Sequence, residues 1–192
     1  MRDHDIRAAL RAKLSRDFAG DDNTCIVEEM GVWSGSVRID MAVINGELSG
    51  FELKSDRDTL ERLPFQADLY SRVFDRVSLV VGERHFQRAV DYVPYWWGVL
   101  IATQDHQRIR LELKREAELN PSPEPYLVAQ LLWKEEALSV LEVHDLARGW
   151  RSKRVKDIHT RLATELPFEV LADHVRVGLK KRKGWLRQSV SG

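Results

Sequence analysis

The sequence of 192 residues contains a single cysteine, Cys25, and has no long apolar run. One cysteine excludes an internal disulfide framework and a zinc site built from several cysteines. The longest apolar run, from Tyr95 to Thr103, has the length of a strand, whereas a membrane span needs roughly 20 apolar residues. The charged first residues lack the apolar core of a signal peptide. We therefore expect a cytoplasmic protein that makes no membrane contact.

Several common catalytic patterns are also missing. The glycines form no phosphate-binding loop, and the six histidines show no metal-ligand spacing. Hydrophobic residues make up 43% of the chain and charged residues 31%, a composition typical of a folded globular protein. Any chemistry must therefore come from other residue types.

The formal net charge is zero, with 30 basic and 30 acidic residues, which at first argues against a nucleic-acid partner. The charge is nevertheless divided unevenly. Residues 151–192 contain eleven Lys/Arg and four Asp/Glu, a net charge of +7, and residues 1–150 carry −7. This asymmetry is typical of a basic tail that binds nucleic acid, and also of a solvated helical surface. Arg151, Lys153 and Arg154 are the candidate phosphate contacts in this tail.

Apolar periodicity and turn residues predict the order of elements. The first part of the chain is expected to contain a helix over 5–18, strands over 24–30, 37–44 and 47–54, a helix over 55–74, a strand over 77–81, a helix over 84–92, and strands over 95–103 and 108–113. Pro64 is the misfit in the second of these helices, where it marks either a kink or the start of the regular part.

Three of the six prolines fall within residues 119–125, which predicts a boundary there. Beyond it, helices are expected over 127–143, 155–166 and 168–183. We therefore predict an α/β domain with a mixed sheet over residues 1–118 and a basic C-terminal helical extension over 119–192.

The informative charged residues lie on the second and third predicted strands. Asp40 precedes a run of apolar residues, where burial of a lone carboxylate would be costly. Alternation places Glu52 and Lys54 on one face of the next strand and Leu53 on the other. Two carboxylates and an ammonium at one end of a sheet favour a Mg²⁺ (or Mn²⁺) site with a lysine beside it.

The turn between these strands decides which residues face each other. Asn45-Gly46 between two apolar strands is a strong hairpin signal. A two-residue loop places Asp40 opposite Phe51, whereas a three-residue loop that includes Glu47 places Asp40 opposite Glu52. The sequence alone leaves both registers open.

Asp40, eleven intervening residues and then Glu52-Leu53-Lys54 resemble the motif of the PD-(D/E)xK nuclease superfamily. That superfamily includes restriction endonucleases, Holliday-junction resolvases and RecB-type nucleases, and a small bacterial group within it shares further stretches with this chain. The resemblance implies a restriction-endonuclease-like core of one helix, three antiparallel strands, a helix and a strand. It also favours the register that pairs Asp40 with Glu52. The proline that usually precedes the motif aspartate is replaced by Ile39.

The resemblance also implies roles for residues around the motif. A glutamate from the first strand commonly joins the metal ligands. Parity does not decide between Glu28 and Glu29, and the resemblance favours Glu29. The backbone carbonyl of Leu53 is implied as a further ligand. Gln66 and Tyr70 have the Gln-x₃-Tyr spacing of RecB-type nucleases and would support catalysis and contact substrate respectively.

Two residues near the motif are candidates for contact with nucleic acid. Arg38 shares a strand face with Asp40 and suits either a phosphate or a ligand carboxylate. Trp33, in the preceding turn, can stack on a base, although packing within the loop is the commoner role for such a residue.

The sequence therefore predicts a metal-dependent phosphodiesterase that acts on nucleic acid, with DNA favoured over RNA. Asp40, Glu52, Lys54 and Gln66 are the expected catalytic residues, and Glu29, Asp40, Glu52 and Leu53 the expected metal ligands. The chain would work alone, as a homodimer or with a partner protein. The alternative is a catalytically inactive DNA-binding or assembly module that keeps the nuclease scaffold.

Overall fold

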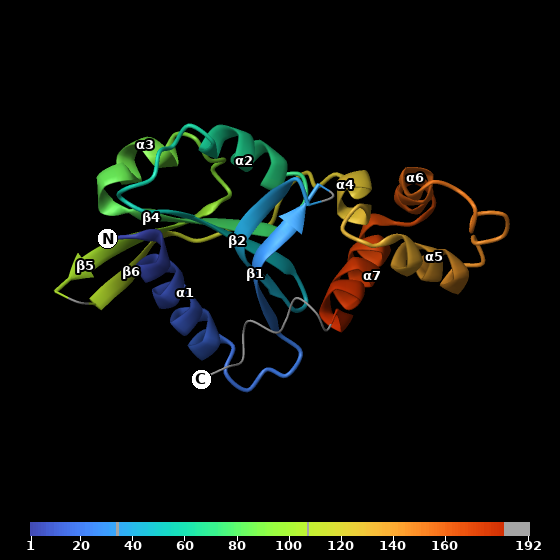
Figure 1. Ribbon diagram of the computed structural model, residues 1–192, viewed down its shortest axis with the longest axis horizontal. Coiled ribbons are helices and arrows are strands. Elements are labelled where there is room, and N and C mark those ends of the chain that lie inside the picture. Colours follow the sequence, from blue (N-terminus) through green and yellow to red (C-terminus); the bar gives the residue numbers. More distant parts are fainter. Residues whose placement is uncertain (34, 107, 183–192) are drawn as a thin grey trace.

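The computed structural model of the chain describes residues 1–33, 35–106 and 108–182. Six strands form one mixed sheet in the order β1-β2-β3-β4-β5-β6, with helices on both faces and the C-terminal helices at one end (Figure 1). The strands are β1 (Cys25–Val32), β2 (Val37–Ile44), β3 (Leu48–Lys54), β4 (Arg76–Gly82), β5 (Gly98–Asp105) and β6 (Arg108–Arg115). The helices are α1 (Asp3–Asp17), α2 (Leu63–Tyr70), the 3₁₀ turn η1 (Glu83–His85), α3 (Phe86–Val90), α4 (Pro125–Ala129), α5 (Lys134–Val143), α6 (Val155–Glu165) and α7 (Phe168–Lys181). The predicted mixed α/β class and the C-terminal helices are confirmed.

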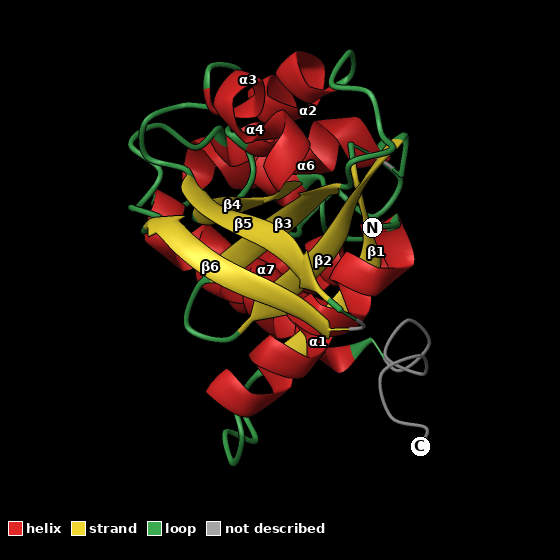
Figure 2. Cartoon of the chain, turned by 90° about the vertical axis from the view of Figure 1, so that its left-hand side faces the viewer, coloured by secondary structure: helices red, strands yellow, loops and turns green. Residues whose placement is uncertain are grey.

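The strands are antiparallel at both ends of the sheet and parallel in its centre. β1, β2 and β3 form an antiparallel meander, β3, β4 and β5 run parallel, and β6 returns antiparallel to β5. Figure 2 shows β6 at the outer edge of the sheet, with α2 and α3 on one side and α1 on the other. Because β3 to β5 are parallel, their carboxyl ends meet at one edge, which is where Glu52 and Lys54 lie.

Helix α1 covers one face of the sheet with the stripe that its sequence predicts. Ile6, Leu10 and Leu14 are buried there against side chains that include Met41 and Leu53. The Asp5 carboxylate accepts a hydrogen bond of 2.8 Å from the Arg2 backbone N–H, which holds the first turn. Replacing one of these leucines by alanine would cost about 2–5 kcal/mol, so α1 is firmly placed.

The other face carries the larger apolar core, which contains α2 and extends into the C-terminal helices. Tyr70, Phe74 and Trp97 are fully buried in it, with Tyr70 in edge contact with Phe74 and stacked on Trp97. Gly50 lies beneath this cluster, because a Cβ atom there would meet Ile39 Cδ1 at 2.4 Å and Phe74 Cδ1 at 3.0 Å. A larger residue at position 50 would therefore require Ile39 and Phe74 to shift.

The loop between β2 and β3 has three residues, 45–47, because Ile44 pairs with Leu48. The Asn45 side-chain oxygen accepts a hydrogen bond of 3.0 Å from the Glu47 backbone N–H and closes the turn. The ladder continues to Met41 opposite Phe51, so the next position along it sets Asp40 against Glu52. Of the two registers open from the sequence, the structure has the one in which these carboxylates meet.

Two predicted helices are shorter than their apolar patterns indicate. The predicted helix over 55–74 is confined to α2, because Pro64 lies in the first turn and residues 55–62 form turns instead. The predicted helix over 127–143 is divided into α4 and α5, which begins after Trp133. There Glu136 accepts a hydrogen bond of 2.7 Å from the Trp133 backbone N–H, as a capping residue does.

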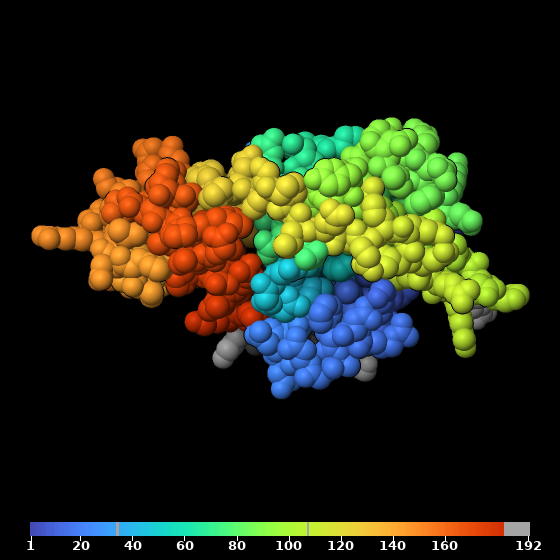
Figure 3. Space-filling view, turned by 180° about the vertical axis from the view of Figure 1, so that it is seen from behind, coloured from blue at the N-terminus to red at the C-terminus, as the bar shows by residue number. Residues whose placement is uncertain are grey.

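The proline-rich segment 119–125 is bound to the end of α2. The Asn120 side chain donates hydrogen bonds of 2.7 and 2.9 Å to the carbonyls of Ser71 and Phe74, and Glu124 N–H donates to Arg72 O at 2.8 Å. Figure 3 shows the residues after this segment, in orange and red, as a lobe at one end of the molecule. The domain boundary at 118/119 stays a prediction, since one apolar core runs through both regions.

An ion pair also joins the sheet to α7. Asp75 accepts a hydrogen bond of 2.7 Å from the Leu48 backbone N–H and pairs with Arg176 at 3.0 Å.

In the described part of the chain, no helix is both long and apolar enough to cross a lipid bilayer.

Candidate active site at the fork between β2 and β3

A polar pocket of about 660 Å³ opens where β2 parts from β3. Most of the site residues expected from the sequence line it, together with side chains from α1 and from the turns before α2. The lining residues are Asp3, Arg7, Glu29, Gly35, Ser36, Val37, Arg38, Asp40, Glu52, Leu53, Lys54, Asp58, Thr59, Arg62 and Gln66. Below, this is called the Asp40 pocket.

Asp40 lies at the fork itself. The β2–β3 ladder ends at Met41 opposite Phe51, while β3 continues to Lys54 along β4. The backbone N–H of Leu53 thereby loses its strand partner, and it donates to Asp40 Oδ2 at 2.8 Å. The carboxylate thus replaces a missing ladder hydrogen bond, which fixes its position beside the ExK segment.

At the position of Asp40, β1 and β2 also change which side chains point to which face of the sheet. Alternation would place residues three positions apart on opposite faces. Two such pairs nevertheless join the same core, Val27 with Met30 and Ile39 with Ala42. Between them stand Glu29 and Asp40, and Glu29 has a φ of +51°, a left-handed conformation that costs about 1–3 kcal/mol for a residue with a side chain. This local strain explains why strand parity could not choose between Glu28 and Glu29.

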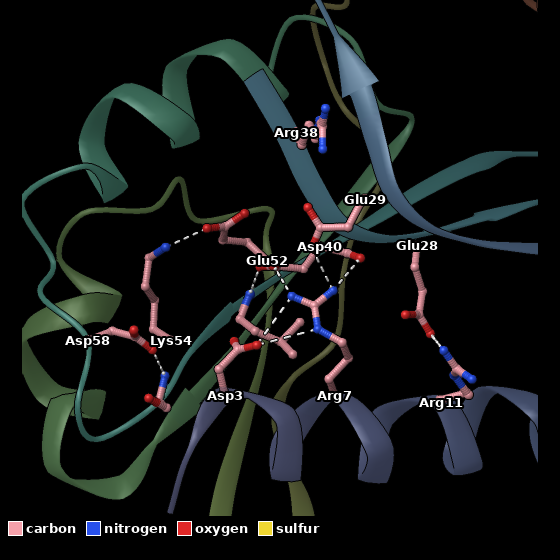
Figure 4. A network of polar contacts seen from close by, with 12 residues as sticks. Asp3, Arg7, Arg11, Glu28, Glu29, Arg38, Asp40, Glu52, Lys54 and Asp58 are labelled. Carbon is pink, nitrogen blue, oxygen red and sulfur yellow. Dashed lines mark hydrogen bonds and ion pairs between the residues drawn. The ribbon is translucent and has the colours of Figure 1, made fainter. Parts of the chain in front are cut away.

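Arg7, from α1, holds together the acidic side of the pocket (Figure 4). Its guanidinium pairs with Asp40 Oδ1 at 2.6 Å, with Glu29 Oε1 at 2.9 Å and with Asp3 Oδ2 at 3.3 Å. It also donates to the Asp40 backbone carbonyl at 3.0 Å. Glu28 pairs instead with Arg11, one helical turn further along α1.

Glu52 and Lys54 form a buried ion pair on the α2 side of β3, visible at the left of Figure 4. Lys54 Nζ contacts Glu52 Oε1, while Glu52 Oε2 is buried without a hydrogen-bond partner among the described residues. Burial and the negative charge of Asp40 raise the pKa of Glu52 to about 7, against the opposing effect of Lys54. A buried oxygen left unpaired beside a second carboxylate is costly and marks a place where a cation would lower the free energy.

Burial also raises the pKa of Asp40, opposed by the Leu53 N–H and by Arg7.

In the described residues, no group of three or more His, Cys, Asp or Glu side chains is close enough together to hold a metal ion. Glu29, the expected third carboxylate, is taken up by Arg7. The carboxylates facing the fork are therefore Asp40 and Glu52.

Gln66 and Tyr70 lie on the buried face of α2. Gln66 lines the pocket and its side-chain oxygen is buried without a hydrogen-bond partner among the described residues. Tyr70 is fully buried, and its hydroxyl donates to the Arg38 carbonyl at 2.7 Å. Burial and the charge of Glu52 raise the pKa of Tyr70. Tyr70 is thus buried in this structure, where its hydroxyl holds β2, and its expected contact with substrate stays a prediction.

The sequence-predicted basic residues divide between two places. Arg38 is exposed at the Asp40 pocket, and Figure 4 shows it standing beyond the carboxylate network. Arg151, Lys153 and Arg154 are exposed in the connection between α5 and α6, at the end of the molecule away from the sheet (Figure 1). Arg151 pairs there with Glu142 at 2.5 Å. The structure therefore does not bring these three residues to the pocket.

Arg7 and Arg62 are the two basic residues of the pocket that no sequence motif indicates. Arg62 is exposed at the pocket, next to the start of α2. Neither residue belongs to the ExK motif, and Arg7 comes from a helix 33 residues before Asp40. The sequence contains one signal for Arg7. Arg7 and Arg11 are four residues apart beside the apolar stripe of α1, and their positive charges are opposite to those of the adjacent pair Glu28 and Glu29.

A family model described as Bacteriophage P4 protein cII matches residues 1–189. The chain belongs to the phage P4 cII family. Protein cII of Enterobacteria phage P4 is 25% identical to this cII family member over 182 residues, which make up 95% of the chain and 68% of that protein. The match thus includes both the sheet and the C-terminal helices. Membership of the PD-(D/E)xK superfamily, and of a bacterial group within it, stays a prediction.

Among solved structures, SfsA of Pyrococcus furiosus in complex with Ca²⁺ has a TM-score of 0.33 and 13% sequence identity to this cII family member. The similarity covers 58% of this chain and 64% of the SfsA chain, which is less than two thirds of SfsA. A likeness this remote assigns neither a fold nor an activity.

Proposed function

We propose that this chain is a metal-dependent nuclease with a restriction-endonuclease-like core, which hydrolyses phosphodiester bonds in nucleic acid, with DNA the favoured substrate. The observation that carries the proposal is the buried Glu52–Lys54 pair beside Asp40 at the strand fork. Burial of such a pair costs desolvation free energy, so the pair itself is weak evidence for a stabilising role. Carboxylates with perturbed pKa values that cluster in a polar pocket are typical of catalytic sites. The order of α1, β1, β2, β3, α2 and β4 agrees with the core that the sequence resemblance implies.

The donor set at the fork fits a small divalent cation. Mg²⁺ is held by one or two carboxylates and keeps several waters, so Asp40, Glu52 and the Leu53 carbonyl would be sufficient. The unpaired Glu52 oxygen is available to such an ion. The raised pKa of both carboxylates reflects ionised forms that burial leaves poorly compensated, and a bound cation would favour those ionised forms. Glu29 would join only after leaving Arg7. When bound, Mg²⁺ or Mn²⁺ supplies a nucleophilic water and stabilises charge on a phosphoryl oxygen.

The chain's own residues would complete the reaction. Lys54 Nζ lies against Glu52, where an ammonium can orient the attacking water and stabilise developing negative charge. Gln66 offers an unpaired side-chain oxygen in the same pocket and can hold that water by a hydrogen bond. Arg38 and Arg62 are exposed at the pocket and suit the phosphates on either side of the scissile bond.

A cleavage assay with labelled DNA and Mg²⁺ or Mn²⁺ tests this function. We expect Asp40→Asn and Lys54→Met each to lower the cleavage rate at least about 100-fold, because each removes charge that acts on the reacting phosphate. Asp91→Asn is the matched control, since Asp91 is an exposed acid outside the Asp40 pocket. An RNA strand of the same sequence, run in parallel, distinguishes the two substrates. Cleavage that persists in both Asp40→Asn and Lys54→Met would exclude this site.

Metal binding has a readout that does not depend on activity. Isothermal titration with Mg²⁺ or Mn²⁺ alone should detect binding to the wild-type chain and a loss of at least about tenfold in affinity for Asp40→Asn. Asparagine can still accept the hydrogen bond from Leu53, so this variant keeps that contact at the fork and loses the charge of Asp40. Equal affinity in both chains would show that Asp40 holds no metal.

The Arg7 contacts favour one second candidate, a catalytically inactive module that binds nucleic acid or takes part in an assembly. Arg7 already neutralises Asp40 and Glu29, as a structural cation would. This module is expected to bind DNA with no cleavage under any divalent cation, and Asp40→Asn would then weaken folding without changing DNA affinity. Cleavage that depends on Asp40 and Lys54 excludes it.

A further inference from the structure

Two aromatic side chains remain exposed beside the Asp40 pocket. Trp33 is 46% exposed and Phe65 is 52% exposed. Their ring centroids are 6.4 Å apart, with planes inclined at 37°. Exposed aromatic pairs next to a polar site are typical of a surface that receives a ligand. A ligand that covers the rings removes their apolar surface from water, which is favourable.

The positions of both rings connect them to the pocket. Trp33 directly follows β1 and lies two residues before Gly35, which lines the pocket. Phe65 lies on α2 directly before Gln66, another lining residue. Figure 1 shows the end of β1 beside α2, and the contact between the two rings joins these elements next to lining residues of the pocket.

The local backbone keeps the rings outward. Trp33 has a φ of +50°, a conformation that is rarely adopted by residues with a side chain. Phe65 belongs to the exposed face of α2, whose opposite face is buried through Leu63, Ala67 and Tyr70. The turn therefore holds Trp33 next to Phe65 instead of folding it into the core, which corrects the packed-loop role expected from the sequence.

The charges next to the rings suit a phosphate backbone. Arg38 and Arg62 are exposed at the same pocket, and among the described residues neither guanidinium takes part in an ion pair. Guanidinium groups beside aromatic rings are the usual combination in proteins that bind single strands, where phosphates track the charges and bases stack on the rings.

We propose that Trp33 and Phe65 form a stacking platform for an unpaired base of single-stranded nucleic acid, so that the substrate of the Asp40 pocket is a single strand or a single-stranded end. This inference rests on the proposed function, because it takes the pocket as the place of the scissile phosphate. A single strand fits better than a duplex, since duplex bases are already stacked on each other and expose no free face.

Binding of a labelled strand of roughly 12 nucleotides, measured by fluorescence anisotropy in EDTA, tests the platform without cleavage. We expect the single strand to bind more tightly than the same sequence as a duplex. Trp33→Ala should weaken single-strand binding between about 5-fold and about 150-fold, the range for loss of one stacked base. Trp33→Phe should restore most of the affinity, because phenylalanine can also stack.

The matched control is Tyr95→Ala. Tyr95 is 71% exposed and precedes the start of β5, so it lies at the end of the parallel strands opposite to Lys54. It should leave affinity unchanged. A strand with abasic sites keeps the phosphates and removes the bases. Wild type should lose affinity for that strand, whereas Trp33→Ala should bind the abasic and the normal strand alike.

Two results would overturn the platform. One is a duplex that binds at least as tightly as the single strand. The other is a Trp33→Ala variant that behaves like Tyr95→Ala. Either result leaves the cleavage assay unaffected, because binding is measured without divalent cation. Conversely, a chain that stacks single strands but never cleaves them would refute the proposed function and keep the platform.

Discussion

At the scale of single residues, the site combines groups that the sequence pattern indicates with one that it does not. Asp40, Glu52 and Lys54 lie in one pocket, in the register that the family resemblance favours and that hairpin pairing alone leaves open. Arg7 could not be predicted in the same way, because its contacts with Asp40 and Glu29 depend on how α1 packs across the sheet. Local patterns therefore place residues on a strand, but tertiary packing decides which charges meet.

Glu52 gives the folded chain a specific dependence on pH. Its pKa is about 7 in the folded protein, above the usual value of 4.5. The unfolded chain therefore loses this proton first as the pH rises, and the contribution of the group to stability, complete below about pH 4.5, is lost as the pH passes through about 7. The difference corresponds to at most about 3 kcal/mol.

Urea unfolding at pH 5 and pH 8, without added cation, measures this effect. We expect the wild-type free energy of unfolding to fall between the two values, and that of Glu52→Gln to fall less, because glutamine does not ionise. Glu61→Gln is the control, since Glu61 is exposed. If Glu52→Gln and wild type have parallel pH profiles, the raised pKa of Glu52 is wrong.

At the scale of elements, the strands were easier to predict than the helices. β2 has the bounds that its apolar run indicates, and the other strands differ by a few residues at their ends. Helix α2 is shorter because Pro64 starts it, although the apolar pattern extends to both sides. The break between α4 and α5 left no periodic signal, since buried residues such as Leu131 and Leu132 continue through it.

The packing of β3 against α2 gives a prediction for one element. Gly50→Ala should lower the free energy of unfolding by about 1–3 kcal/mol, because the added methyl group meets Ile39 and Phe74. Gly46→Ala should change stability by less than about 0.5 kcal/mol, since nothing lies within 4 Å of its Cβ position. Urea unfolding of both variants checks the pair, and equal effects would contradict the close packing described for β3.

At the scale of the whole molecule, a net charge of zero conceals exposed basic residues in two separate places. Arg38 and Arg62 stand at the Asp40 pocket, while the basic residues of the α5–α6 connection lie at the far end of the C-terminal helices (Figure 1). Composition revealed the excess of positive charge in the tail. It could not reveal the distance of that charge from the fork, because distance depends on the complete chain path.

The salt dependence of single-strand binding separates these regions. Replacing Arg38 and Arg62 by alanine should reduce the slope of log affinity against log salt concentration by about 0.7 for each lost phosphate contact. The triple variant Arg151→Ala, Lys153→Ala, Arg154→Ala should leave the slope for a short strand unchanged, because that strand does not extend so far. A reduced slope in the triple variant would show that these residues contact the strand, as the sequence predicts.

The position of Arg7 has a consequence for how the protein is made and handled. Arg7 is part of the polypeptide, so its guanidinium pairs with Asp40 and Glu29 as soon as α1 packs on the sheet. The protein therefore carries its own counter-ion for these two acids, unlike small zinc domains that stay unfolded until metal arrives. Biosynthesis need not wait for a cation from the surroundings, and dialysis against a chelator is expected to leave the purified chain folded.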